Sequence, residues 1–163
     1  MPRLAILNAE PQDAPVLAEL HRESLRPCWS AEDLAASCRM PARVTLKACA
    51  DIDIVGFSVT QIAADEAELL TIAVRDAYRR RGVASHLLAA SIDACHERGL
   101  SSIYLEVACG NSAAQALYAA LGFCPIGRRK AYYERGLHAS EDAEIWKLDL
   151  SPPHSVDPLA SKT

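Results

Sequence analysis

The sequence lacks the marks of several classes of protein. It contains no run of 18 apolar residues, and its first residues turn polar at Asn8, so we expect neither a membrane-spanning helix nor a secretory signal. A net charge of −4 does not suit a protein that binds nucleic acid, whose binding surface would be basic. We therefore expect no membrane and no nucleic-acid partner.

Cysteine motifs are missing as well. The six cysteines form no Cys-x-x-Cys pair and have no histidine at the spacing of a zinc site. In apolar surroundings a free thiol acts as a small hydrophobic side chain, and this is the stronger interpretation here. We expect a cytoplasmic protein, in a reducing compartment, that uses no metal.

The composition that remains is that of a globular protein. Half of the 163 residues are hydrophobic and 23% are charged, which is enough for one domain with a closed core. We place this domain at residues 1–150. Residues 151–163, which hold three prolines, are predicted to form a disordered tail.

Hydrophobic periodicity predicts an α/β protein with a mixed central sheet. Helices are expected over residues 14–20 with Asp13 as N-cap, over 31–39 behind a capping box at Ser30, from Gly82 to Gly99, and over 111–121. Strands are expected over residues 4–7, 44–50, 54–62, 68–74, 103–108, 123–126 and 143–150. The short connections from residue 44 to residue 74 predict an antiparallel meander, and the long helix that follows predicts a right-handed βαβ crossover. Helices should then cover both faces of the sheet.

The segment 72–85 is the most informative in the chain. A strand runs into a loop with three arginines, a glycine follows, and a helix begins at once. Free backbone N–H groups and the helix dipole make such a helix start a site for phosphate, and Gly82 and the small Ala84 permit close approach. The glycines and lysine of a P-loop or a Rossmann fingerprint are absent. On spacing alone, a basic surface turn explains the segment equally well.

The pattern Arg79-x-x-Gly82-x-Ala84 resembles the pyrophosphate loop of the GNAT superfamily of N-acetyltransferases. Further stretches resemble the RimI type within it, at residues 68–74, 105–107, 111–114, 116–118, 121–123, 128–133 and 141–143. RimI-type enzymes acetylate the N-terminal alanine of a small-subunit ribosomal protein. The resemblance, which covers about residues 4–150, implies a single-domain GNAT fold, acetyl-CoA as acetyl donor and a protein N-terminus as acceptor.

The resemblance also assigns the cofactor site. The strand that precedes the loop would offer main-chain groups to the pantetheine arm, at Ile72, Ala73 and Val74. The loop and the first turn of the helix would wrap the pyrophosphate, at Arg80, Arg81, Gly82, Val83, Ala84 and Ser85.

Glu106 and Tyr118 are the candidates for proton transfer. Glu106 lies near the end of an otherwise apolar strand, where a buried carboxylate would be uncommon; a solvent-facing or ion-paired residue is the alternative. Asn111 and Tyr118, two helical turns apart, share a helix face. The alternatives are a plain N-cap for Asn111 and a core aromatic with its hydroxyl at the rim for Tyr118. An ammonium must lose a proton before it attacks a thioester, and the departing thiolate benefits from an acid. By resemblance to RimI, Glu106 is the base, Tyr118 the acid, and Asn111 a cofactor contact.

Tyr132 and Tyr133 would wall a peptide slot by the same resemblance, although two strand residues that pack on opposite faces are an equal alternative. Two departures affect the acceptor side: one residue is inserted before Trp29 in the Pro-Trp-Ser loop of the family, and Lys130-Ala131 alters the Arg-Asn pair expected before the tyrosines. Two other functions remain open. One is a GNAT enzyme that acts on a small amine, a polyamine or a lysine, and the other is a non-catalytic regulator that binds acyl-CoA.

Overall fold

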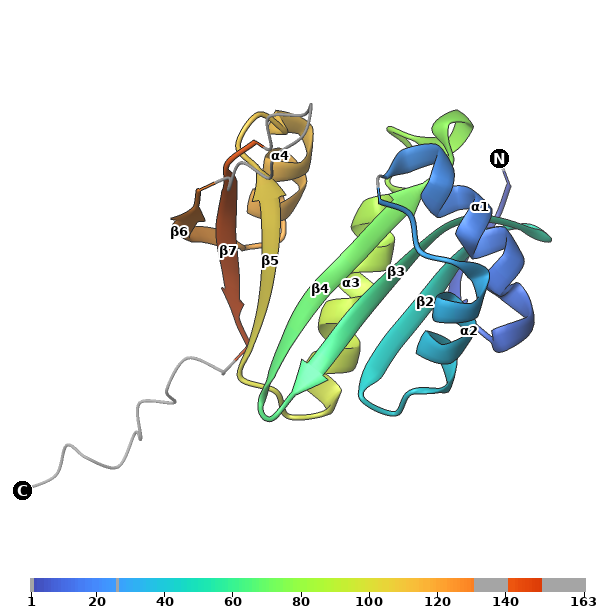
Figure 1. Cartoon of the computed structure of the whole chain (residues 1–163), viewed down its shortest axis with the longest axis horizontal. Helices are drawn as coiled ribbons and strands as arrows, with labels where there is room; N and C mark the ends of the chain where they lie inside the picture. The colour runs from blue at the N-terminus through green and yellow to red at the C-terminus, as the bar shows by residue number, and fades with distance from the viewer. Residues whose placement is uncertain (1, 26, 131–140, 151–163) are drawn as a thin grey trace, which may run out of the picture.

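The computed structural model describes residues 2–25, 27–130 and 141–150. The predicted tail at 151–163, and Tyr132 and Tyr133, lie outside these residues. The described strands form one sheet in the order β1-β2-β3-β4-β5-β7-β6 (Figure 1). Their bounds are β1 Leu4–Asn8, β2 Arg43–Ala50, β3 Asp53–Ala63, β4 Glu66–Val74, β5 Ser102–Ala108, β6 Cys124–Arg129 and β7 Ala143–Asp149.

Helices cover both faces of the sheet, as predicted. Two short 3-10 helices, η1 Pro11–Asp13 and η2 Asp76–Tyr78, accompany α1 Ala14–Ser24, α2 Ala31–Arg39, α3 Val83–Glu97 and α4 Ser112–Ala120. Helices α1 and α2 pack with Phe57 and Val59 on one face. Helices α3 and α4 lie on the other face, where Leu88 of α3 and Tyr118 of α4 share one apolar cluster. None of the described helices is long and apolar enough to cross a membrane.

The predicted meander and crossover are both confirmed. Strands β2, β3 and β4 pair antiparallel through short turns. Strand β5 returns after α3 and pairs parallel to β4. Capping chemistry fixes the start of α2 as expected, because the Ser30 hydroxyl accepts from the Asp33 N–H (3.0 Å) and the Ser30 N–H donates to the Asp33 carboxylate (3.3 Å).

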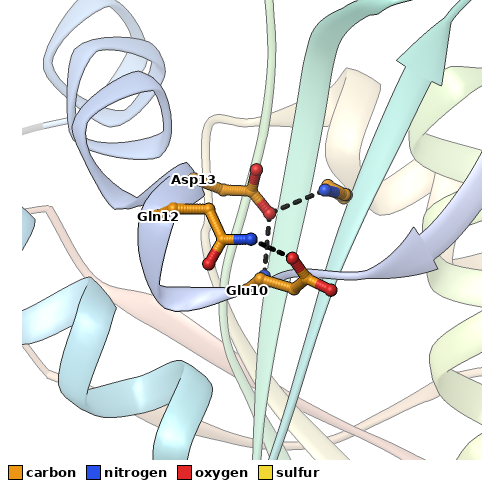
Figure 2. Close-up of polar contacts among 4 residues, drawn as sticks. Glu10, Gln12 and Asp13 are labelled. Atoms are coloured by element: carbon orange, nitrogen blue, oxygen red, sulfur yellow. Dashed lines mark hydrogen bonds and ion pairs between the residues drawn. The ribbon is translucent and has the colours of Figure 1, made fainter.

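The start of α1 differs from the prediction. Asp13 stands at the N-cap position, but its side chain makes no capping bond to α1. Its carboxylate instead accepts from the Glu10 N–H (2.8 Å) and pairs with Lys47 on β2 (2.7 Å), as Figure 2 shows for Glu10 and Asp13. The partner on β2 is 34 residues away in sequence, and it fixes the entry of α1 against the sheet.

Strands β4 and β5 pair over only a short stretch. Their register joins Glu66 to Ser102, Ala67 to Ile103 and Glu68 to Tyr104, and no pair follows toward the carboxyl ends. The two strands then diverge in a V (Figure 1), which we call the splay. Because ligands of such sheets bind at the carboxyl ends of parallel strands, the splay positions the candidate site.

Candidate functional site

The edge of β4 that faces the splay carries unpaired main-chain groups. The Arg75 N–H donates to Val55 O on β3 (2.8 Å), and Ala73 stands opposite Phe57 of β3. Since main-chain groups of a strand point alternately to its two sides, those of Ile72 and Val74 face the splay and those of Ala73 face β3. The Val74 carbonyl already accepts from Arg79 Nε (3.3 Å). Two N–H groups, of Ile72 and Val74, and the Ile72 carbonyl are thus open to a ligand.

The loop between β4 and α3 is held in shape by one of its arginines. Arg79 pairs with Asp76 (3.1 Å), and its guanidinium also donates to the Ser24 hydroxyl at the end of α1 (3.4 Å). Arg80 and Gly82 adopt positive φ angles of 59° and 78°, which turn the chain sharply into the helix. Arg81 lies over the Tyr78 ring, 5.3 Å from its centroid. Arg80 and Arg81 are exposed, so their charge is available at the helix start.

The first turn of α3 has free donors. The first bond of the helix runs from the His86 N–H to Gly82 O (3.0 Å), and within the described chain the N–H groups of Val83, Ala84 and Ser85 have no partner. No acidic residue lies in this turn. The Val83 side chain is buried in the core, so only its main chain can serve a ligand. Free N–H groups at the positive end of a 15-residue helix form an anion site.

A cavity of about 570 Å³ borders this helix start, lined by Pro2, Leu4, Ala50, Tyr78, Arg80, Arg81 and Val83. No residue of β4 lines this cavity, but Val74 of β4 and Val83 of α3 pack in one apolar cluster, so the end of β4 and the start of α3 are neighbours. Among the described residues, no group of three or more His, Cys, Asp or Glu side chains could hold a metal ion, and the predicted lack of a metal stays a prediction. All six cysteines are free thiols.

Glu106 is not a buried carboxylate, and that premise of the sequence analysis is wrong. Its neighbours Leu105 and Val107 point into the core with α4, so alternation along β5 turns Glu106 to the opposite face, the one that α1 and α2 cover. Its side chain is 38% exposed and pairs with Arg129 of β6 (2.7 Å). The carboxylate stands at the β5 side of the splay with part of its surface open to an acceptor.

Tyr118 lies on the other face of the same strand. Its ring is 6% exposed and packs 5.9 Å from the Phe123 ring, so it is a core aromatic. Its hydroxyl makes no hydrogen bond to the described residues. If it were fully buried, it would be a buried polar atom without a partner, but among the described side chains only Thr60 Oγ1 is such an atom. The Tyr118 hydroxyl therefore reaches solvent. Burial raises the pKa of the phenol, which keeps it protonated and able to donate.

Asn111 is the N-cap of α4. Its side-chain oxygen accepts from the Ala114 N–H (3.2 Å), which leaves the side-chain NH₂ for another partner. Two residues near the site had no predicted role: Arg129, which lies in the RimI-like stretch 128–133, and His21 of α1, whose ring bonds Thr71 of β4. Arg129 bonds Glu106 23 residues away and His21 bonds Thr71 50 residues away, and no local pattern predicts these two bonds.

Comparison with known proteins agrees with this arrangement. The acetyltransferase (GNAT) family profile matches residues 14–123. The ribosomal protein bS18-alanine N-acetyltransferase of Salmonella typhimurium is 41% identical over 108 residues, which are 66% of this chain and 72% of that protein. The crystal structure of the ribosomal-protein-S18-alanine N-acetyltransferase from Escherichia coli is 30% identical, with a TM-score of 0.83 over 94% of this chain and 98% of its own.

A more distant structure, an N-acetyltransferase from Thermoplasma acidophilum in complex with coenzyme A, has a TM-score of 0.74 over 90% of this chain and 99% of its own. At 21% identity it shows the fold alone. The family match and the two closer relatives confirm the predicted GNAT fold and the resemblance to the RimI type. The chain is an acyltransferase that belongs to the GNAT family of acetyltransferases.

Proposed function

We propose that the chain transfers the acetyl group of acetyl-CoA to the α-amine of a protein N-terminus, with the alanine start of ribosomal protein S18 as its candidate acceptor. The splay carries this proposal, because it joins unpaired main-chain groups on β4 to an anion site at the start of α3. A long, polar molecule with a diphosphate at one end and amide groups along its arm fits such a path. The names of the relatives supply the acceptor.

The cofactor would lie along the open edge of β4. Amide groups of the pantetheine arm would bond the main chain at Ile72 and Val74, as a further strand would. The diphosphate would accept from the free N–H groups of Val83, Ala84 and Ser85, with Arg80 and Arg81 beside it. This path directs the thioester into the splay, between the face that bears Glu106 and the face that bears Tyr118.

Glu106 and Tyr118 would then divide the proton transfers. The acceptor ammonium gives a proton to the Glu106 carboxylate, directly or through water, and the neutral nitrogen attacks the thioester carbonyl. As the new C–N bond forms and the C–S bond breaks, the thiolate takes the Tyr118 proton. The nitrogen gives up its second proton to water, and a proton from water restores the Tyr118 phenol. Arg129 holds one oxygen of Glu106 and so fixes the direction of the other. The neighbours of Glu106 on β5, Leu105 and Val107, pack in the same apolar cluster as Tyr118 of α4, so this core sets the position of β5 relative to α4.

The acceptor class follows from the cost of deprotonation. An α-amine with a pKa of about 8 is roughly a quarter neutral at pH 7.4, against about 0.1% of a lysine at about 10.4. An exposed carboxylate is a weak base, and it suits the easier of these two substrates. The six free cysteines agree with a cytoplasmic enzyme that works on newly made ribosomal protein.

The test is an assay for free CoA thiol with acetyl-CoA and a panel of acceptors. We expect turnover with a peptide that begins with the alanine of S18, and none when its α-amine is blocked. Turnover with spermidine or an internal lysine alone would replace the proposal with an enzyme for small amines or lysine. Binding of CoA by calorimetry without any turnover would indicate a non-catalytic regulator.

A further inference from the structure

A buried histidine links three parts of the protein around the splay. His21 lies on α1 and is 2% exposed, with its ring 5.9 Å from the Trp29 ring and 6.0 Å from the Phe57 ring. A polar ring in such surroundings is costly unless both of its nitrogens have partners. Both do: Nδ1 lies 3.2 Å from the Trp29 backbone nitrogen, and Nε2 lies 3.1 Å from Thr71 Oγ1.

These two contacts determine the state of the ring. A backbone N–H can only donate, so Nδ1 must be the acceptor of the Trp29 bond. In the neutral ring the proton is then on Nε2, which donates to the Thr71 hydroxyl. Burial lowers the pKa of His21, in agreement with a neutral ring. Protonation of Nδ1 would set two donors against each other and break the contact with Trp29.

The two partners lie on different sides of the candidate site. Thr71 is the residue of β4 directly before Ile72, whose main chain faces the splay. Trp29 belongs to residues 27–30, which lead into α2. In Figure 1 this segment lies on the side of α1 and α2 that is nearer to β4. The guanidinium of Arg43 lies over the Trp29 ring, 5.5 Å from its centroid. Trp29 is thus held between His21 and Arg43, on the sheet face to which Glu106 points.

We propose that His21 is a positioning residue, which fixes residues 27–30 against β4 so that this segment forms one wall of the acceptor site. This inference rests on the proposed function. It assigns His21 no contact with acetyl-CoA or with the reacting atoms. Its contribution is to the affinity for the acceptor peptide, because a loose wall must be ordered each time a peptide binds.

The experiment compares variants of the full chain by steady-state kinetics. His21→Leu removes both bonds. The bond to the Trp29 N–H is the one that orders residues 27–30, so we expect the KM for the acceptor peptide to rise about tenfold, which corresponds to about 1.4 kcal/mol. The kcat at saturating peptide should change less than threefold, and the Kd for CoA should not change. His21→Asn keeps an acceptor near the position of Nδ1 and should recover part of the lost KM. If His21→Leu fails to fold, Thr71→Val takes its place. It removes only the bond between His21 and β4, and it should also raise the KM for the acceptor peptide.

Ser91→Ala is the matched control. Ser91 is 1% exposed and shares a buried hydrogen bond with Ser58 (3.2 Å) on the α3 face, away from the acceptor side. A purely structural role for His21 predicts that both variants lower the melting temperature and that neither changes the peptide KM; that result would overturn the inference.

Amide exchange gives a readout that needs no acceptor. We expect the Trp29 amide to exchange faster in His21→Leu and at an unchanged rate in Ser91→Ala. An unchanged Trp29 rate in His21→Leu would overturn the inference even if the KM rose. Absence of turnover in the unmodified chain would instead remove the proposed function, and the positioning role with it.

Discussion

Gly82→Ala tests the anion site at the start of α3, and Gly99→Ala is its control. The two glycines have φ angles of 78° and 71°, so an alanine at either one enters the left-handed region. A Cβ at Gly82 would lie 3.6 Å from the His86 ring, and one at Gly99 would have no neighbour within 4 Å, so neither clashes. Each variant should lose about 1–2 kcal/mol of stability, which lowers the melting temperature by about 2–8 °C in a domain of this size.

Binding of CoA should separate the two variants. Gly82 is the N-cap residue, directly before the free N–H groups of the first helical turn, so a methyl group there would stand beside the proposed phosphate site. The loss of one charge-assisted hydrogen bond, about 1.5–3 kcal/mol, corresponds to a Kd raised about ten- to hundredfold. Gly99 follows the other end of α3, and its variant should bind CoA as the unmodified chain does.

The assay is calorimetric titration with CoA, together with thermal unfolding in the absence of ligand. The thermal experiment measures whether the two variants lose a similar amount of stability from placing an alanine at a positive φ angle. Equal Kd values for Gly82→Ala, Gly99→Ala and the unmodified chain would refute the placement of the phosphate at the start of α3.

Further predictions concern the acid–base pair and the core. Glu106→Gln should lower kcat/KM about 10²-fold or more with the CoA Kd unchanged; near-normal turnover would remove its role as base. Tyr118→Phe should lower kcat. Because burial raises the phenol pKa above its usual 10, the unmodified enzyme should lose this acid with a midpoint above pH 10 in a pH–rate profile. Thr60→Val removes a buried hydroxyl without a partner and should leave the melting temperature equal or higher; a fall would reveal a missed bond. Because burial lowers the pKa of His21, the unfolded chain binds a proton more readily than the folded one, and the fold loses stability as the pH falls below about 6.5. Between pH 7 and pH 5 the melting temperature should therefore fall less in His21→Asn than in the unmodified chain.

Local chemistry made much of this fold predictable. The capping box at Ser30 and the glycine before α3 involve neighbours within four residues, and both helices begin where the sequence predicts. Asp13 shows the opposite case, since Lys47, 34 residues away, takes the carboxylate that was expected to cap α1. Side-chain competition of this kind is invisible until the sheet is formed.

The candidate site likewise has features that the local sequence predicts and features that depend on distant residues. The period of two along Ile103, Leu105 and Val107 already implies that Glu106 faces away from that core, a signal that the search for a buried carboxylate overlooked. The partners of Glu106 and His21 could not be inferred, because Arg129 and Thr71 meet them only through the order of the strands in the sheet.

The splay also has a thermodynamic consequence. The amides of Ile72 and Val74 lie in the middle strand of the sheet that the described strands form, yet they can exchange with solvent without any strand being separated. A molecule bound there protects them and adds its binding free energy to that of folding, by about 2.7 kcal/mol at a hundred times its Kd. If acetyl-CoA binds in the splay as proposed, the resistance of this sheet to heat depends on the acetyl-CoA concentration as well as on the residues of the sheet.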